Sequence, residues 1–88
     1  MASYSVRIKA SARKELEAVA TKADRQRIVA RINALATEPR PIGAIKLSGS
    51  ERYRIRQGRY RILYSIDNSI LLIEIIRIAD RKRAYSQS

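Results

Sequence analysis

The segment that decides the fold of this chain reads YRIRQGRYRILY over residues 53–64. It holds four arginines and three tyrosines, and the arginines alternate with Ile, Leu and Tyr. Such alternation is typical of a β-strand with one buried face and one exposed face. Gln57-Gly58 is a plausible two-residue turn, so the segment predicts a β-hairpin. With that turn, the facing pairs are Arg56 with Arg59 and Arg54 with Arg61.

These facing pairs put like charges directly opposite each other, which destabilises a sheet. A fold does not need that arrangement, but a polyanion lying on the face would explain it. Of the net charge of +11, the largest share comes from residues 40–61, which hold seven basic groups and one acidic group. Residues 1–39 hold eight basic and four acidic groups. Such clustering of positive charge favours a nucleic-acid partner over a merely solvated basic surface.

The composition limits the chemistry that the chain can perform. Its 88 residues fit a single domain over 1–88, and they include neither cysteine nor histidine. Disulfide, thiolate and histidine chemistry are therefore excluded, and we expect neither a metal nor a cofactor. No signal peptide is visible at the start, and the longest apolar run, Ile70–Ile73, is too short to span a bilayer. We expect a soluble cytoplasmic protein.

The remaining segments predict one more strand before the hairpin, two helices and a last strand. Residues 4–8 alternate like a strand, and Ile70–Ile78 is an almost wholly apolar strand. Ser11 and Asp24 are candidate N-caps for the two helices. The helices show apolar stripes at Ala12, Leu16, Val19 and Ala20, then at Ile28, Ile32, Leu35 and Ala36.

This order predicts an α+β domain of the form β-α-α-β-β-β. Two N-terminal helices form an αα-hairpin on one face of a four-stranded, largely antiparallel sheet. Period-two alternation assigns the side chains to faces. The tyrosines belong to the core, on the face that the helices cover. That face takes Tyr53, Ile55, Tyr60, Ile62, Tyr64, Ile66, Leu71, Ile73 and Ile75.

The opposite face is expected to be open, with a basic end and an apolar floor. Glu74 would lie across from or diagonal to Arg61 and could hold it in a structural ion pair. The arginines of the basic end are Arg52, Arg54, Arg56, Arg59 and Arg61. The apolar floor consists of Leu63, Leu72, Ile76 and Ile78.

Five short elements in order resemble the RelE/ParE toxin superfamily, and within it the RelE-like ribosome-dependent mRNA interferases. Together they extend over nearly the whole chain. They are SARKEL at 11–16, RQRIVARI at 25–32, KLSG at 46–49, the hairpin strands YRIR and YRILY at 53–56 and 60–64, and DRKRAY at 80–85.

The resemblance implies a toxin that enters the ribosomal A site and cuts mRNA there by in-line attack of a 2′-hydroxyl. It implies catalytic roles for Arg56, Arg61, Arg81 and Tyr85. Arg61 would stabilise the transition state, Arg81 would lie near the leaving oxygen, and Tyr85 would stack on or orient a nucleotide. Further phosphate contacts are expected from Arg52, Arg54, Arg59, Lys46 and Arg83.

Two positions depart from the family pattern. Arg56 stands where some relatives have lysine, and arginine stays protonated, so Arg56 is expected to clamp phosphate rather than act as a base. Asp80 stands where many relatives carry histidine. It could accept a proton or merely pair with a neighbouring arginine. The proton acceptor is therefore open, and the ribosome could supply part of it.

Two other functions compete with the ribonuclease: a ParE-like gyrase-inhibiting toxin, and a non-catalytic basic RNA-binding module. The resemblance also implies a cognate antitoxin protein as a partner, besides the ribosome and mRNA. The open face, with arginines beside Leu63, Leu72 and Ile76, suits an amphipathic segment with acidic residues.

Overall fold

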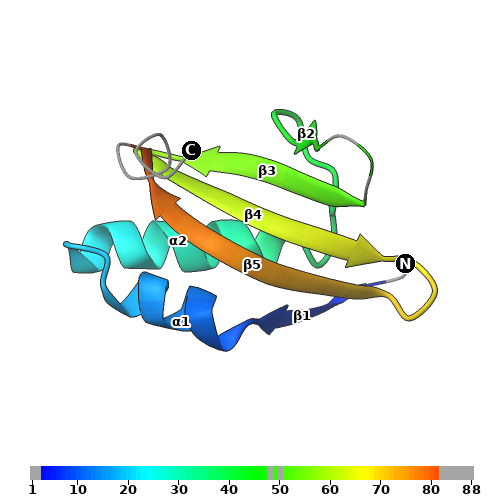
Figure 1. The fold of residues 1–88 in the computed structure, drawn as a ribbon, viewed down its shortest axis with the longest axis horizontal. Coiled ribbons are helices and arrows are strands. Elements are labelled where there is room, and N and C mark those ends of the chain that lie inside the picture. The colour runs from blue at the N-terminus through cyan, green and yellow to red at the C-terminus, as the bar shows by residue number, and fades with distance from the viewer. Residues whose placement is uncertain (1–2, 48, 50, 82–88) are drawn as a thin grey trace.

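The computed structural model describes residues 3–47, 49 and 51–81, and within them two helices lie on one face of a five-stranded sheet (Figure 1). The predicted α+β class is confirmed. The elements are β1 (Ser5–Ile8), α1 (Ala10–Glu17), α2 (Lys22–Ala34), β2 (Ile45–Lys46), β3 (Arg52–Gln57), β4 (Tyr60–Asp67) and β5 (Leu72–Asp80).

The strands lie in the order β1-β5-β4-β3-β2, and only the pair of β1 and β5 is parallel. The predicted antiparallel meander of the last three strands is therefore confirmed, but the predicted count of four strands is wrong. The extra strand, β2, consists of two residues at the sheet edge, Ile45–Lys46. Two residues cannot display an alternating pattern, so periodicity gives no signal for it.

Both predicted N-caps are displaced. Helix α1 begins at Ala10 after Lys9, which makes no side-chain cap, so Ser11 lies inside the helix. In α2 the cap is Thr21, whose hydroxyl accepts the backbone N–H of Asp24 at 3.1 Å. Asp24 instead stands in the first turn, where its charge is favourable near the positive helix end.

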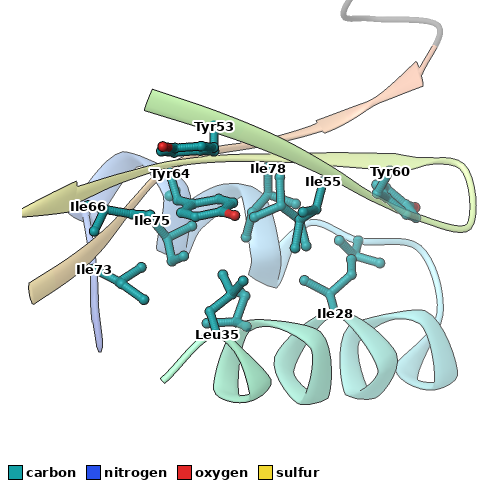
Figure 2. Packing of buried hydrophobic residues seen from close by; sticks show 14 residues of the cluster. Ile28, Leu35, Tyr53, Ile55, Tyr60, Tyr64, Ile66, Ile73, Ile75 and Ile78 are labelled. Carbon is teal, nitrogen blue, oxygen red and sulfur yellow. The ribbon is translucent and has the colours of Figure 1, made fainter. Parts of the chain in front are cut away.

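The core lies between the helices and the sheet, as the face assignment predicts, except that Leu71 lies in the turn before β5 and is 38% exposed. Ile28, Ile32 and Leu35, in and just after α2, are at most 1% exposed. In Figure 2, Ile28 and Leu35 point toward the sheet residues Ile55, Tyr64 and Ile75. All six predicted core positions in the hairpin strands are buried: Tyr53, Ile55, Tyr60, Ile62, Tyr64 and Ile66.

The hairpin turn lies one residue later than predicted. Gln57 pairs with Tyr60, so the turn is Gly58-Arg59, and Gly58 has φ +59°. Tight hairpin turns need a positive φ at their first central residue, which glycine adopts freely and glutamine does not. The register of the strand pairing therefore shifts by two residues in total, which keeps the side chains of β3 and β4 on their predicted faces but leaves Arg59 in the turn.

A β-bulge in β5 overturns part of the prediction for the open face. Leu63 pairs with Arg77 whereas Tyr64 pairs with Ile75, so Ile76 is an extra residue in the ladder. Beyond the bulge the faces exchange. Ile78 is consequently 3% exposed in the core, and Arg77 takes the open-face position beside Leu63.

The buried phenol of Tyr64 links the core to the loop after α2 by a hydrogen bond whose contribution to stability can be tested. Its hydroxyl donates to the carbonyl oxygen of Pro39 at 2.7 Å, and its ring stacks on Tyr53 with centroids 5.7 Å apart. Burial raises the pKa of Tyr64 to about 12. The pKa of an unfolded tyrosine is about 10. The folded protein therefore holds the Tyr64 proton more tightly than the unfolded chain does. The stability that this difference contributes is complete below pH 10 and is lost between pH 10 and 12.

We expect Tyr64→Phe to lower the free energy of unfolding at neutral pH by about 1–2 kcal/mol, because the Pro39 carbonyl loses its donor. The variant should also lose less stability than the wild type between pH 10 and 12. Urea unfolding across this range measures both effects, and parallel curves for the two proteins would contradict the assignment.

Candidate nucleic-acid interface

The open face of β3 and β4 gathers four of the predicted arginines. Arg52, Arg54 and Arg56 alternate along β3, which spaces them about 7 Å apart. Across the ladder, Arg56 faces Arg61, whereas Arg54 faces Leu63 and not Arg61 as predicted. The structure therefore brings these arginines into one cluster, named here the arginine face: Arg52, Arg54, Arg56 and Arg61.

Arg61 is the most buried member of this face, with 8% of its surface exposed, while Arg56 opposite is exposed. On its other side, Arg61 is flanked by Ala79 of β5. Like charges directly opposite each other in a sheet are unfavourable, and the register places two guanidinium side chains in that position. The Nε of Arg54 is also buried, and no described residue accepts its hydrogen bond. An anion with several acceptor oxygens could accept from the Arg54 Nε and would complement the positive charge of this face.

Glu74 does not hold Arg61, so the alternative of a structural ion pair between them is wrong. Glu74 lies opposite Ser65, four residues and about 13 Å along β4 from Arg61. Its carboxylate pairs instead with Arg7 of β1, at 3.3 Å. The cluster at Arg56 and Arg61 is thus remote from that carboxylate.

Arg59 and Asp80 lie at the end of the sheet rather than on the arginine face. Arg59 is in the turn, and its Nη2 contacts Oδ2 of Asp80 at 2.6 Å. Asp80 is the register partner of Tyr60, so it belongs to the helix-covered side of the sheet. The structure does not bring this carboxylate onto the face that carries Arg56 and Arg61.

Lys46 also stands apart from the arginine face. It is the partner of Tyr53, and its Nζ contacts Glu51 at 3.2 Å. That hydrogen bond holds the pKa of Glu51 below its usual range. Arg40 joins the same network, donating from Nε to the Tyr53 hydroxyl at 2.9 Å. The network fastens the loop before β2 to the start of β3.

The C-terminal site residues are only partly described. Arg81 is exposed, and its backbone N–H donates to the carbonyl oxygen of Arg59 at 2.8 Å. Arg83 and Tyr85 lie outside the described residues.

Arg77 is the open-face residue that sequence reasoning missed. It flanks Leu63 on the side opposite Arg54, and its Nε lies 3.6 Å from Glu15 of α1. Simple alternation assigns Arg77 to the core, and the bulge at Ile76 leaves no distinct mark in a run of isoleucines.

Two other kinds of site are not found in the part of the chain that the structure describes. Neither helix is long and apolar enough to cross a bilayer. No three residues of the types His, Cys, Asp and Glu gather in a way that could hold a metal ion.

Comparison with known proteins assigns the family. The model for the ParE toxin of the type II toxin–antitoxin system parDE matches residues 6–85. This match extends over nearly the whole chain. The chain therefore belongs to the RelE/ParE superfamily, as a toxin of a toxin–antitoxin system. No curated protein matches the sequence significantly.

Solved structures with the same fold come from RelE toxins. The RelE–RelB complex of Pyrococcus horikoshii OT3 has a chain 29% identical, with a TM-score of 0.79 over 92% of this chain and 98% of that one. The RelBE2 complex of Mycobacterium tuberculosis has one 27% identical, with a TM-score of 0.76 over 90% and 99%. The isolated E. coli RelE toxin, at 21% identity, shares the fold with a TM-score of 0.75 over 96% and 93%.

Proposed function

We propose that this toxin is a ribosome-dependent endoribonuclease that cuts mRNA in the ribosomal A site and thereby stops translation in the cytoplasm. The observation that carries the proposal is the arginine face, in which the largely buried Arg61 stands opposite Arg56. Preorganised cations aimed at phosphoryl oxygens are a main means of stabilising phosphoryl transfer.

In the proposed reaction, the 2′-oxygen of one nucleotide attacks the adjacent phosphorus in line. A 2′,3′-cyclic phosphate forms, the bond from phosphorus to the 5′-oxygen breaks, and the 5′-oxygen takes up a proton. Arg61 and Arg56 offset the charge on the non-bridging oxygens, while Arg54 and Arg52 hold flanking phosphates. Arg81 acts near the leaving 5′-oxygen, and Tyr85 orients a nucleotide.

The proton acceptor for the 2′-hydroxyl is not supplied by the arginine face. Arginines stay protonated at neutral pH, and the chain has no histidine or cysteine. Asp80 belongs to the other side of the sheet and contacts Arg59. These facts favour a reaction in which the ribosome orders the message and contributes to proton transfer.

A ParE-like action on gyrase is the second candidate, and the match to a ParE toxin model favours it. The two candidates differ in what the arginine face must do. Cleavage needs a cation at a reacting phosphate, whereas inhibition of gyrase requires only binding.

We further propose that a cognate antitoxin protein covers the open face. The RelE toxins of P. horikoshii and M. tuberculosis are seen in complexes with their antitoxins. Here, Arg54 lies beside the half-buried Leu63, so an amphipathic segment with acidic residues would complement the surface.

A paired assay separates the two candidate functions. The toxin is added to a translating extract, where primer extension detects cuts in the mRNA, and to a gyrase supercoiling reaction in parallel. Cuts in the message with normal supercoiling support the ribonuclease. Intact message with inhibited supercoiling would overturn it in favour of the gyrase toxin.

A further inference from the structure

A second charged cluster stands at the β3–β4 turn, where β5 ends. Nη2 of Arg59 contacts Oδ2 of Asp80 at 2.6 Å, and 19% of the Asp80 side chain is exposed. The backbone N–H of Arg81 donates to the carbonyl oxygen of Arg59 at 2.8 Å, one step beyond the last ladder pair of Tyr60 and Asp80. A side-chain contact and a backbone contact therefore tie the same two segments together.

We propose that Arg59 and Asp80 form a clasp that positions Arg81 for the cleavage reaction, an inference that rests on the proposed function. Arg81 directly follows Asp80, and Ala79, just before it, is the register partner of Arg61. A constraint on Asp80 therefore fixes where Arg81 leaves the sheet relative to Arg61. In-line attack depends on such placement, since small errors in geometry cost large factors in rate.

The geometry assigns both clasp residues a positioning role and not direct contact with RNA. Asp80 pairs with Tyr60 on the helix-covered side, away from Arg56 and Arg61. The guanidinium of Arg59 contacts this carboxylate and also lies 5.9 Å from the centroid of the Tyr60 ring. Its positive charge is therefore already matched within the protein.

The test compares Arg59→Ala, Asp80→Asn and the charge-exchanged double variant, Arg59→Asp with Asp80→Arg. Cleavage of mRNA on programmed ribosomes is measured as kcat and KM. We expect each single variant to lower kcat by about 10-fold with little change in KM, because Arg81 is retained but misplaced. The double variant should recover most of the loss, since the ion pair is restored in reverse.

Arg27→Ala is the matched control. Arg27 pairs with Asp24 at 3.5 Å on α2, so this variant also removes one positive charge and one exposed ion pair. It should cleave at the wild-type rate. Circular dichroism and thermal unfolding check that the clasp variants fold, and the isosteric Asp80→Asn guards against a packing defect.

Other roles for the two residues give different results, each of which would overturn the clasp. If Arg59 binds phosphate, Arg59→Ala raises KM, and Asp80→Asn frees the guanidinium and does not slow cleavage. If Asp80 transfers a proton, Asp80→Asn and the double variant are both inactive, and the pH profile loses one limb.

Amide hydrogen exchange keeps the clasp testable apart from catalysis. In the wild type, the Arg81 amide should be protected, and Arg59→Ala or Asp80→Asn should speed its exchange by about 10-fold or more. Unchanged exchange would overturn the clasp even if the enzyme cuts mRNA. Failure of the wild type to cut ribosome-bound mRNA would instead overturn the proposed function.

Discussion

Arg61→Ala should lower cleavage of ribosome-bound mRNA by about 10²-fold or more while the protein remains folded. The physical reason is the position of Arg61, which is largely buried in the arginine face and is directed by its register toward the open side. A fixed cation there requires no reorganisation as charge develops on the phosphoryl oxygens. Primer extension with a time course gives the rate, and circular dichroism checks the fold.

Removing Arg61 also relieves its like-charge repulsion with Arg56 across the ladder. Arg13→Ala, an exposed change on α1, controls for the loss of one positive charge and should cleave normally. The cleavage rate of Arg61→Lys should lie between those of Arg61→Ala and Arg13→Ala, since lysine keeps the charge but loses the planar fork of donors. An Arg61→Ala protein that cuts at near the wild-type rate would remove Arg61 from the mechanism.

Arg81→Ala tests the leaving-group side of the same reaction. We expect a loss of similar size, about 10²-fold, with folding again unaffected because the Arg81 side chain is exposed. The same primer-extension assay measures it. Rates close to the wild type would show that another group acts at the 5′-oxygen.

Cleavage should depend on the ribosome, and this is the second large effect that we expect. The arginine face can bind phosphates but has no group that accepts a proton from a 2′-hydroxyl at neutral pH. Holding the message in line can be worth many orders of magnitude in effective concentration. The same purified mRNA should therefore be cut with programmed ribosomes that have an empty A site and remain essentially intact without them.

Binding of free RNA to this protein should also be limited when the ribosome is absent. It rests on counterion release, so it should be weak, insensitive to sequence and steeply weakened by salt. Filter binding at several salt concentrations measures the slope. Efficient cutting of naked RNA at preferred sequences would contradict the ribosome dependence and point to a proton acceptor within the protein.

Much of the fold could be predicted because the two-residue alternation of side chains along a strand is insensitive to a shift of the pairing by two residues. Tyr53, Ile55 and Ile62 are buried as expected although the turn is at Gly58-Arg59, since a slide of two residues leaves every face unchanged. The bulge at Ile76, by contrast, inserts a single residue into the alternation. One inserted residue exchanges the faces, so Ile78, which was expected on the open face, lies in the core, and Arg77 takes the open-face position beside Leu63.

Site residues within the long strands could be placed from the alternation of side chains. Site residues at strand ends and in turns could not. Arg54, Arg56 and Arg61 share a face as expected. Arg59, Lys46 and Asp80 do not join them. Their positions follow from a turn, a two-residue edge strand and a strand terminus, and periodicity does not specify these features.

If the arginine face acts on message held by the ribosome, the position of the cut must follow the position of the ribosome. Ribosomes are stalled at one codon of a defined mRNA, and in a second sample at the next codon, before the toxin is added. Primer extension then maps the cut in each sample. We expect a cut in the A-site codon that moves by one codon with the ribosome. A cut that stays at the same nucleotide in both samples, or no cut in either, would contradict it.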